Sequence, residues 1–412
     1  MNILAVIVNY KAAEYCISAV KSIVQSRSFL HAKEAFHIEI VVIDNSTDKK
    51  QAAVLARNLD NDAHLIINKE NTGFSSACNQ AFDMFDSDLV LLLNPDACLL
   101  PGALIQMVAT IASDPDIAAV APRIFWDDEC EYLLPPSMPL WFSSFVSGLA
   151  GDSFMLRSIA SLLWQKYAVK YWQADHLFPV SNMSGGAVLL KRNAVLKSGG
   201  LFDEDFFLYF EDTDLFLRLK KNRYTLLMDP TAGVVHYYNQ CGGENTLFKR
   251  KQMEASEKIF YGKHMGPVVS IIRNTAGLVN YCSMRFSSQL KILKNSLFSG
   301  YCFHRNEHSF CRNLHSYHRN VHSKNKIDFT APFVINLPFG HDEKWLFEWS
   351  PDPFFLTAAA KFGKGNKLRL TEDKWKMFSS GVYYGRITYL AEYGINRSYD
   401  PDFFHSFFTW EK

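Results

Sequence analysis

The sequence of 412 residues has almost no excess of charge of either sign, because 43 Lys and Arg residues face 42 Asp and Glu residues. Without a basic excess the chain lacks the field that draws nucleic acid to a protein, so we exclude a nucleic-acid partner. Hydrophobic residues make up 48% of the chain and charged residues 21%, which excludes a disordered composition. The length predicts a catalytic-size core with at least one appended module.

Long hydrophobic runs are also missing. No run reaches the roughly 18 apolar residues that a membrane span needs, and the nearest, 141–164, contains Ser, Gly, Asp and Arg. The first apolar run ends at Asn9 and Lys11 without a preceding basic region, which does not fit a signal peptide. The chain contains no CxxC pair, and several of its eight cysteines lie within apolar runs, as buried thiols do in a reducing compartment. We therefore expect a soluble or peripheral protein in the cytoplasm.

What the sequence does contain is a repeated alternation of buried strands and helices. Apolar, β-branched runs at 3–9, 38–44, 63–68 and 89–94 are each followed by a stretch with helical spacing. Strands that are apolar throughout are buried on both faces, as in a parallel sheet covered by helices. The pattern predicts an α/β doubly wound fold with a mostly parallel sheet.

Each of these runs ends on a short polar residue. In doubly wound sheets ligands bind beyond the carboxyl ends of the strands, so these residues are candidate ligand contacts. Asx residues at strand ends also make turns and cap helices, and this alternative stays open for each of them. The four are Asn9, Asp44, Asn68 and Asn94.

The rest of the chain is less regular. An insertion at about 123–180 contains an aromatic, amphipathic stretch at 141–167, which is either a pair of core helices or a lip that contacts a lipid-linked substrate. Residues 246–326 read as a helical and basic extension. The basic part, 285–326, is either a solvated linker or a surface for anionic phospholipid, and its histidines lack zinc-finger spacing. Residues 327–412 predict an aromatic, β-rich module that serves packing or substrate binding.

Six ordered motifs resemble the family 2 inverting glycosyltransferases of the GT-A fold, and within them the rhamnosyltransferase-like branch. The likeness spans roughly residues 1–265 and implies a GT-A domain over 1–245. The motifs are VIVNYKA at 6–12, VVIDNSTD at 41–48, NTGFSSACNQA at 71–81, LLLNPDA at 91–97, MSGGAVLLKR at 183–192, and FDEDFFLYFEDTDLFLRLKKNRY at 202–224.

The resemblance implies a site for a dTDP- or UDP-linked sugar. The ends of the first two strands would form the base pocket, where Asp44 accepts a hydrogen bond from a pyrimidine N–H. Gly73 would let the loop backbone approach the nucleotide, and Gly185 and Gly186 would line the donor sugar, although tight packing also explains glycines there. The implied nucleotide-sugar contacts are Asn9, Tyr10, Asp44, Asn45, Asn71, Gly73, Phe74, Asn79, Asn94, Gly185 and Gly186.

Asn94-Pro95-Asp96 occupies the place of the family's metal-binding Asp-x-Asp. A divalent cation there, Mg²⁺ or Mn²⁺, would neutralise the departing diphosphate. Only Asp96 is a carboxylate, so metal affinity would be weak until the nucleotide adds its phosphates. His236 matches a position where the family often supplies a further ligand, although a histidine after a strand is also commonly structural.

Three acids begin a predicted helix at Glu211-Asp212-Thr213-Asp214. Acids in a first turn stabilise the helix dipole, which explains them without chemistry. The resemblance instead makes Asp212 the general base and Glu211 the residue that orients the acceptor, with Asp214 structural. Adjacent carboxylates raise one pKa toward neutrality, as a base requires.

The expected activity is inverting transfer of a sugar, with rhamnose favoured by the branch, to a glycan acceptor. The branch implies an acceptor on polyprenyl diphosphate at the inner membrane face, in surface polysaccharide such as O-antigen or capsule. Two alternatives stay open: a sugar nucleotidyltransferase, which also places acids at strand ends, and a non-catalytic glycan-binding protein that uses 327–412.

Overall fold

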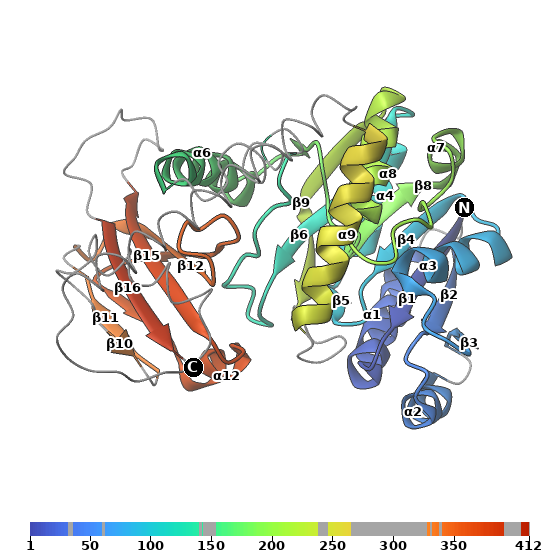
Figure 1. The fold of residues 1–412 in the computed structure, drawn as a ribbon, viewed down its shortest axis with the longest axis horizontal. Coiled ribbons are helices and arrows are strands. Elements are labelled where there is room, and N and C mark those ends of the chain that lie inside the picture. Colours follow the sequence, from blue (N-terminus) through green and yellow to red (C-terminus); the bar gives the residue numbers. More distant parts are fainter. Residues whose placement is uncertain are drawn as a thin grey trace, which may run out of the picture. The chain divides into compact units, whose positions relative to one another are not determined.

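The computed structural model describes residues 1–31, 36–59, 62–139, 142, 154–237, 246–264, 328–329, 332–337, 340–390 and 405–411 (Figure 1). The chain divides into two compact units. The first contains 1–144 and 168–270, and the second contains 145–167 and 271–412. The expected basic surface at 285–326 and most of 141–153 lie outside the described residues.

The first unit is built on a nine-stranded mixed sheet with the order β3-β2-β1-β4-β8-β6-β9-β5, and β7 pairs with β9. β1 is parallel to β2 and β4, and β2 is parallel to β3. β8 runs antiparallel between β4 and β6. The strands are β1 (Asn2–Asn9), β2 (His37–Asp44), β3 (His64–Ile67), β4 (Leu89–Leu93), β5 (Ala97–Leu99), β6 (Ile117–Phe125), β7 (Phe178–Pro179), β8 (Ala187–Lys191) and β9 (Thr225–His236).

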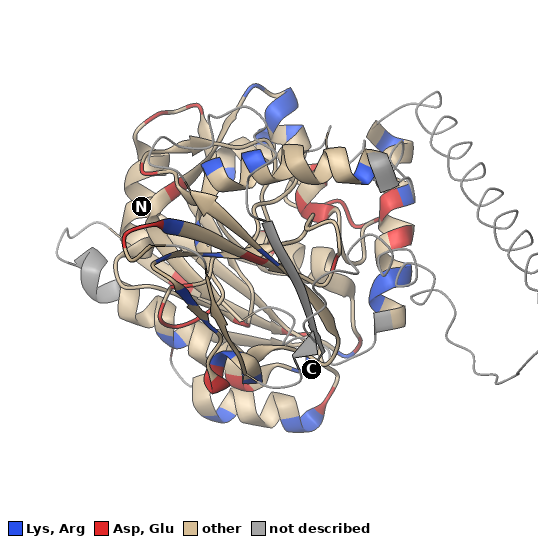
Figure 2. Cartoon of the chain, turned by 90° about the vertical axis from the view of Figure 1, so that its left-hand side faces the viewer, with Lys and Arg blue, Asp and Glu red and all other residues tan. Residues whose placement is uncertain are grey.

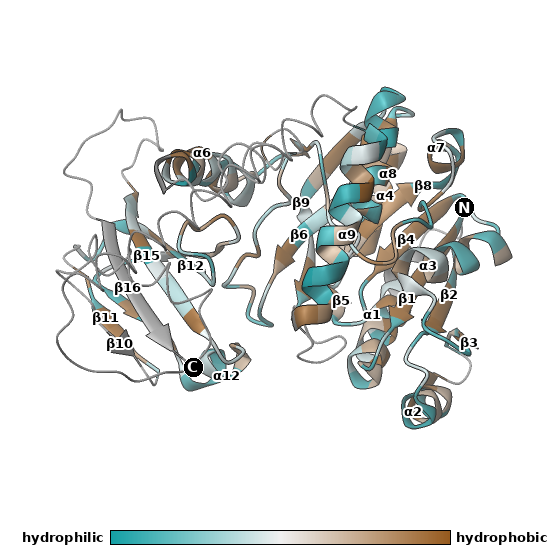
Figure 3. Cartoon of the chain, viewed as in Figure 1, coloured by the Kyte–Doolittle hydropathy of each residue, from teal (hydrophilic) through white to brown (hydrophobic). Residues whose placement is uncertain are grey.

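The central strands are buried on both faces, and Figure 3 shows them mostly brown. Ile3, Ala5 and Ile7 of β1 join one hydrophobic cluster with side chains of α1, α2 and α4. Leu4 and Val6, which alternate with them, are equally buried on the other face. The continuous apolar runs of the sequence follow from this double burial.

Helices connect the strands of the first unit. α3 begins at Gly73, and α8 begins at Glu211 directly after Phe210, which has a φ of 69°. α9 packs Phe260 and Tyr261 against Phe206, so it belongs with the segment that precedes α8. The helices are α1 (Ala13–His31), α2 (Lys49–Leu59), α3 (Gly73–Met84), α4 (Ala103–Ala112), α6 (Phe154–Trp172), α7 (Arg192–Lys197), α8 (Glu211–Lys221) and α9 (Thr246–His264).

The second unit contains a five-stranded sheet with the order β10-β16-β15-β12-β13 and a two-stranded sheet of β11 and β14. Glu348 of β12 lies opposite Arg386 of β15, and the two form a buried bidentate ion pair at 2.7 and 2.9 Å. The elements are β10 (Asp328–Phe329), β11 (Val334–Asn336), β12 (Lys344–Ser350), β13 (Ala359–Lys364), β14 (Lys367–Arg369), α12 (Glu372–Met377), β15 (Val382–Leu390) and β16 (His405–Glu411).

The α/β fold class with its β-rich C-terminal module is confirmed. The expected domain boundaries at 245 and 326 stay predictions. Part of the insertion expected at 123–180 packs on the C-terminal sheet and not on the first unit. Gln165 of α6 donates a hydrogen bond to Glu348 of β12. No helix among the described residues is long and apolar enough to span a membrane.

Candidate active site

Two polar residues meet where β1 and β2 end. Asn9 and Asp44 are paired in the parallel register, and Asn9 Nδ2 donates a hydrogen bond to Asp44 Oδ1 at 2.9 Å. Asn9 Oδ1 in turn accepts from the backbone N–H of Ala12 at 3.1 Å. Both side chains are fully buried, yet Asp44 Oδ2 has no hydrogen-bond partner within the protein. A buried carboxylate oxygen without a donor is costly, so Asp44 is suited to accept from a ligand.

Asn45 links the end of β2 to the loop that precedes α3. Its Nδ2 donates to the carbonyl of Gly73 at 2.9 Å, and its Oδ1 accepts from Asn68 Nδ2 at 2.8 Å. Asn71 Oδ1 accepts from the backbone N–H of Gly73 at 3.0 Å. The bond of Asn71 is an Asx turn, whereas the two bonds of Asn45 join segments more than 20 residues apart, and together they fix the loop beside Asp44.

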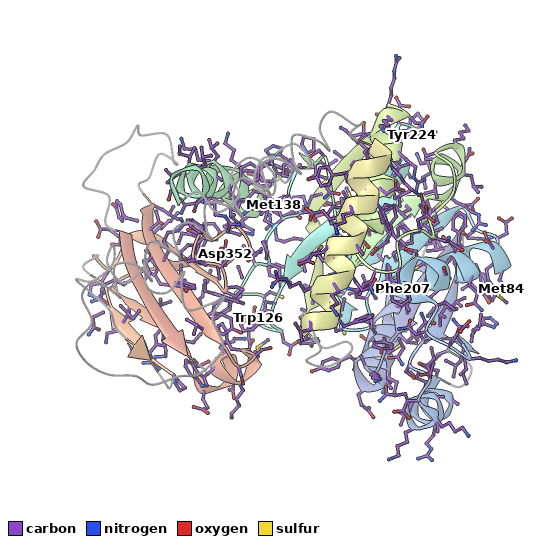
Figure 4. The ribbon with its side chains drawn as sticks, viewed as in Figure 1. Met84, Trp126, Met138, Phe207, Tyr224 and Asp352 are labelled. Carbon is purple, nitrogen blue, oxygen red and sulfur yellow. The ribbon has the colours of Figure 1, made fainter. Side chains whose placement is uncertain are left out.

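Gly73 is the point of closest approach in this loop. It has a φ of +86°, and a Cβ atom there would lie 2.6 Å from the carbonyl oxygen of Phe207. The same carbonyl accepts a hydrogen bond from the N–H of Phe74 at 2.8 Å. Phe207, labelled in Figure 4, also contacts the ring of Phe248 on α9. Only glycine fits this position, both for its backbone and for the space available.

Asp96, which lies between β4 and β5, meets His236 at the end of β9. Ala97 of β5 pairs with His236 of β9, and this register places His236 Nε2 3.1 Å from Asp96 Oδ1. Asn94 Nδ2 lies 3.5 Å from the same imidazole nitrogen. Asp96 is 2% exposed and His236 8%, so the pair is held away from bulk water.

Two consecutive glycines connect this group to the acids of α8. A Cβ atom at Gly186 would lie 3.0 Å from Asn94 Nδ2 and 3.3 Å from His236 Cε1. The backbone N–H of Gly185 donates to Asp212 Oδ2 at 3.0 Å. The Gly185-Gly186 segment therefore lies between Asp212 and the Asn94–His236 contact, although Asp96 and Asp212 are 116 residues apart in the sequence.

Asp212 is a half-buried carboxylate whose two oxygens are held differently. Oδ1 accepts from the backbone N–H of Thr213 at 2.6 Å and from Thr213 Oγ1 at 3.2 Å. Burial raises the pKa of Asp212, and the hydrogen bonds from Gly185 and Thr213 oppose that rise. A carboxylate with a fixed position and a raised pKa takes a proton more readily than an exposed one, as a general base requires.

Glu211 is more deeply buried than its neighbour. It is 6% exposed, and its Oε2 has no hydrogen-bond partner within the protein. Burial, followed by the charge of Asp212, raises the pKa of Glu211 well above its usual range. The pKa of the Cys78 thiol on α3 is also raised, chiefly by burial and further by the charge of Glu211. Glu211 therefore favours its neutral form next to a charged Asp212.

Asp214, the third acid, has a structural role, as expected. Its Oδ2 accepts from Arg218 Nε at 2.7 Å, and its Oδ1 lies 2.6 Å from His264 Nε2 of α9. The guanidinium of Arg218 also donates to the carbonyls of Ser198, Gly200 and Leu201. Through Arg218, Asp214 anchors α8 to the turn after α7, and through His264 it anchors α8 to the end of α9.

Sequence reasoning missed two of these partners. The spacing of Asp214 and Arg218, four residues apart on one helix face, could have revealed that pair. No signal in the sequence could have linked His264 to Asp214, because the contact spans 50 residues. Thr213 was within the recognised motif, but its bond to Asp212 depends on the local backbone.

Two predicted contacts, Asn79 and Tyr10, make no hydrogen bond described above to the residues of this site, whereas a Cβ atom at Gly185 would lie 3.9 Å from Phe74 Cε1. Asn79 uses its amide to accept from the N–H of Phe202 at 3.0 Å and to donate to its carbonyl at 2.9 Å. It therefore joins α3 to the segment before α8. Tyr10 lies under the ammonium group of Lys11, and Phe74 stacks near Phe202. Their roles toward a nucleotide sugar stay predictions.

Few side chains at this site could act as ligands of a metal ion. Among the described ranges, no cluster of three or more His, Cys, Asp and Glu side chains could hold a metal ion. Asp96 and His236 supply one carboxylate and one imidazole, which fit a divalent cation only when other ligands complete its shell.

Comparisons with known proteins agree with this geometry. The sequence model of Glycosyl transferase family 2 matches residues 4–170, which include the strand ends at Asn9, Asp44 and Asp96. A relative from Mycobacterium tuberculosis (strains CDC 1551 / Oshkosh and ATCC 25618 / H37Rv), N-acetylglucosaminyl-diphospho-decaprenol L-rhamnosyltransferase, is 25% identical over 267 residues. The match covers 61% of this chain and 84% of the relative.

Among solved structures, the chain matches the mannosyltransferase PcManGT from Pyrobaculum calidifontis in complex with GDP-Man and Mn²⁺. It has a TM-score of 0.45 and 15% sequence identity, and covers 77% of this chain and 79% of its own. The family match includes the strand ends of the site at Asn9, Asp44 and Asp96, whereas Asp212 and His236 lie after its last residue, 170. Residues 4–170 accordingly form a Glycosyl transferase family 2 domain, and the chain is a glycosyltransferase.

Proposed function

We propose that the protein transfers a sugar from a nucleoside diphosphate to a glycan hydroxyl with inversion at the anomeric carbon. The observation that carries this proposal is the Gly185-Gly186 segment: the N–H of Gly185 donates to Asp212 Oδ2 at 3.0 Å, and the carbonyl of Gly186 accepts from the backbone N–H of Asn94 at 2.8 Å. One donor molecule could thus reach both a base and the group that faces its diphosphate. Holding donor and acceptor in this way accounts for much of the acceleration in a single displacement.

The nucleotide base is assigned to the ends of β1 and β2. Asp44 Oδ2 is a buried acceptor without a protein donor, and uracil and thymine each offer one ring N–H. Asn9 holds the other oxygen of Asp44 at 2.9 Å, so the free oxygen has a fixed direction. This supports a UDP- or dTDP-linked donor, and the name of the rhamnosyltransferase relative favours rhamnose as the sugar.

The diphosphate is assigned to Asp96 and His236. If a divalent ion binds, these two residues would hold it, and it would supply charge neutralisation of the leaving diphosphate. Asn94, which stands where the family motif has a carboxylate, brings an uncharged amide to within 3.5 Å of His236 Nε2. The imidazole of His236, hydrogen-bonded to Asp96 at 3.1 Å, can hold the position of that carboxylate whether or not a metal is present.

Asp212 would remove the proton of the acceptor hydroxyl. Its Oδ1 is occupied by Thr213, whereas Oδ2 accepts only one described bond, from Gly185, and keeps capacity for the acceptor O–H. Glu211 in its neutral form leaves Asp212 as the ionised carboxylate of the two, and this carboxylate becomes neutral when it takes the hydroxyl proton. The acceptor oxygen then attacks the anomeric carbon opposite the leaving diphosphate, and no covalent enzyme intermediate forms.

We propose a polyprenyl-diphosphate-linked glycan as the acceptor, in surface polysaccharide synthesis such as O-antigen or capsule. The name of the mycobacterial relative specifies a lipid-diphosphate acceptor, which supports this class. The reaction would take place in the cytoplasm, at the inner face of the membrane.

The experiment is a donor panel with a lipid-linked N-acetylglucosamine acceptor, read out by the nucleotide product. Release of nucleoside diphosphate with an inverted anomeric configuration in the product, seen by NMR, is expected. Release of pyrophosphate would instead identify a nucleotidyltransferase, and glycan binding without donor turnover would identify a binding protein. Repeating the assay with EDTA and then with Mn²⁺ or Mg²⁺ decides the metal requirement.

A further inference from the structure

Helix α6 exposes three large aliphatic side chains within little more than one turn. Ile159 is 45% exposed, Leu162 39% and Leu163 48%. They are spaced at i, i+3 and i+4, so they share one face of the helix, and the exposed Lys166 and Lys170 continue that face at i+7 and i+11. We call these five residues the α6 face.

The opposite side of α6 is already packed. Ala160 and Trp164 are buried, and Gln165 Nε2 donates to Glu348 at 2.5 Å and to Thr388 Oγ1 at 3.3 Å. Glu348 is in turn held by Arg386 on the neighbouring strand. The helix is therefore anchored without the α6 face, and its exposed aliphatic residues do not serve the core of the unit to which they belong.

All charged side chains of α6 are basic. Its basic residues are Arg157, Lys166 and Lys170, and its sequence FMLRSIASLLWQKYAVKYW contains no acid (Figure 2). A helix with an apolar patch next to lysines suits the boundary of an anionic bilayer, where aliphatic side chains enter the acyl region and the lysines reach the headgroups. A protein partner of mixed charge would not need a helix without acids.

We propose that the α6 face binds the surface of an anionic phospholipid bilayer. The proposal rests on the proposed function in one respect, because a lipid-linked acceptor is presented at a membrane. α9 also exposes apolar residues, Leu247 and Met253, but its basic residues alternate with acids, and Arg250 is paired with Glu254 at 2.9 Å. α2 and α7 are also basic and contain no acid, but α2 exposes no large hydrophobic side chain and α7 exposes only Leu196. The combination of three exposed aliphatic residues on one face with a helix that has no acid distinguishes α6 among the described helices.

The test is co-sedimentation of the full chain with vesicles of phosphatidylcholine alone and of phosphatidylcholine with phosphatidylglycerol. Wild type is expected to sediment with the anionic vesicles and to lose this binding in high salt. The doubles Leu162→Ser with Leu163→Ser, and Lys166→Glu with Lys170→Glu, are each expected to lower the partition coefficient at least tenfold. The charge double changes only exposed side chains, so it keeps the test valid should the serine double fail to fold.

Leu196→Ser is the matched control, because Leu196 is 53% exposed on α7 and precedes a lysine, Lys197. It should bind vesicles like wild type. The proposal is overturned if wild type does not bind anionic vesicles, if the α6 doubles bind as well as wild type, or if light scattering shows that the face instead joins two copies of the chain.

Transfer to a water-soluble acceptor separates this proposal from the proposed function. The α6 doubles are expected to keep wild-type turnover on a soluble acceptor and to lose turnover on acceptor embedded in anionic vesicles. Vesicle binding by a protein without transferase activity would contradict the proposed function alone. Full transferase activity without vesicle binding would contradict only the bilayer proposal.

Discussion

The backbone N–H of Gly185 donates a hydrogen bond of 3.0 Å to Asp212 Oδ2. This single bond joins the glycine pair that lies before β8 to the first turn of α8. Because the neighbouring Gly186 lies against Asn94 and His236, it also sets the distance between the acid on α8 and the polar end of β4. In the proposed sugar transfer, one donor molecule must span this distance.

Asp212→Asn is expected to reduce kcat by about 10²- to 10⁴-fold, the range for loss of a general base, and to change donor affinity little. The amide keeps the shape of the side chain but cannot take the hydroxyl proton. Turnover and donor binding are measured separately by product release and calorimetry. Asp175→Asn, at a fully exposed acid, is the control, and normal turnover of the Asp212 variant would remove the assignment of the base.

Thr213→Val tests the hydrogen bonds that hold the base. Thr213 Oγ1 donates to Asp212 Oδ1 at 3.2 Å and lowers the pKa of Asp212 by stabilising its charged form. Without this bond the pKa of Asp212 rises further, so the acidic limb of the kcat profile is expected to move to higher pH. A pH profile of kcat for both proteins checks this, and an unchanged limb would show that the titrating group is not Asp212.

Glu211→Gln is expected to change the pH dependence of stability. The folded protein has a pKa for Glu211 well above that of the unfolded chain, so it binds the proton more tightly. The free energy of unfolding of wild type therefore falls as pH rises from the ordinary glutamate pKa through the raised folded value. Glutamine stays neutral, so the Tm of the variant should exceed that of wild type above this window and match it below. Thermal unfolding from pH 4 to pH 9 measures the difference, and a constant offset would contradict the burial of a neutral Glu211.

Asp214→Asn is expected to lower the free energy of unfolding by about 3 kcal/mol, since removing one partner leaves Arg218 without its buried counter-charge. Urea unfolding measures the loss. Glu254→Gln breaks an exposed ion pair with Arg250 that has the same spacing, and should change stability by no more than about 0.5 kcal/mol. Equal effects of the two variants would mean that Asp214 does not anchor α8.

Gly73→Ala and Gly102→Ala separate backbone strain from close packing. Both glycines have positive φ, +86° and +80°, but a Cβ at Gly102 meets nothing within 4 Å, whereas at Gly73 it meets Phe207. Gly102→Ala should cost about 1 kcal/mol of stability and leave donor affinity unchanged. Gly73→Ala should cost more and weaken donor binding, measured by calorimetry. Equal stability losses with unchanged donor affinity would show that the loop does not need this contact.

Much of the fold was readable in the sequence because both faces of the central strands are buried. Runs such as 3–9 and 89–94 have no polar alternation, and the structure places them as adjacent parallel strands. The antiparallel insertion of β8 between β4 and β6 was not readable, because strand order depends on contacts far apart in the chain. The pairing of α6 with β12 was missed for the same reason.

The sequence by itself determined the fold class, the family, and which polar residues end the strands, since periodicity and local motifs are properties of neighbouring residues. Only the tertiary structure decided that Asp214 pairs with His264, that Asn79 holds the backbone of Phe202, and that Gly185 faces Asp212. These contacts join segments between 27 and 123 residues apart. Their distances depend on how helices pack on the sheet, and no local pattern encodes that packing.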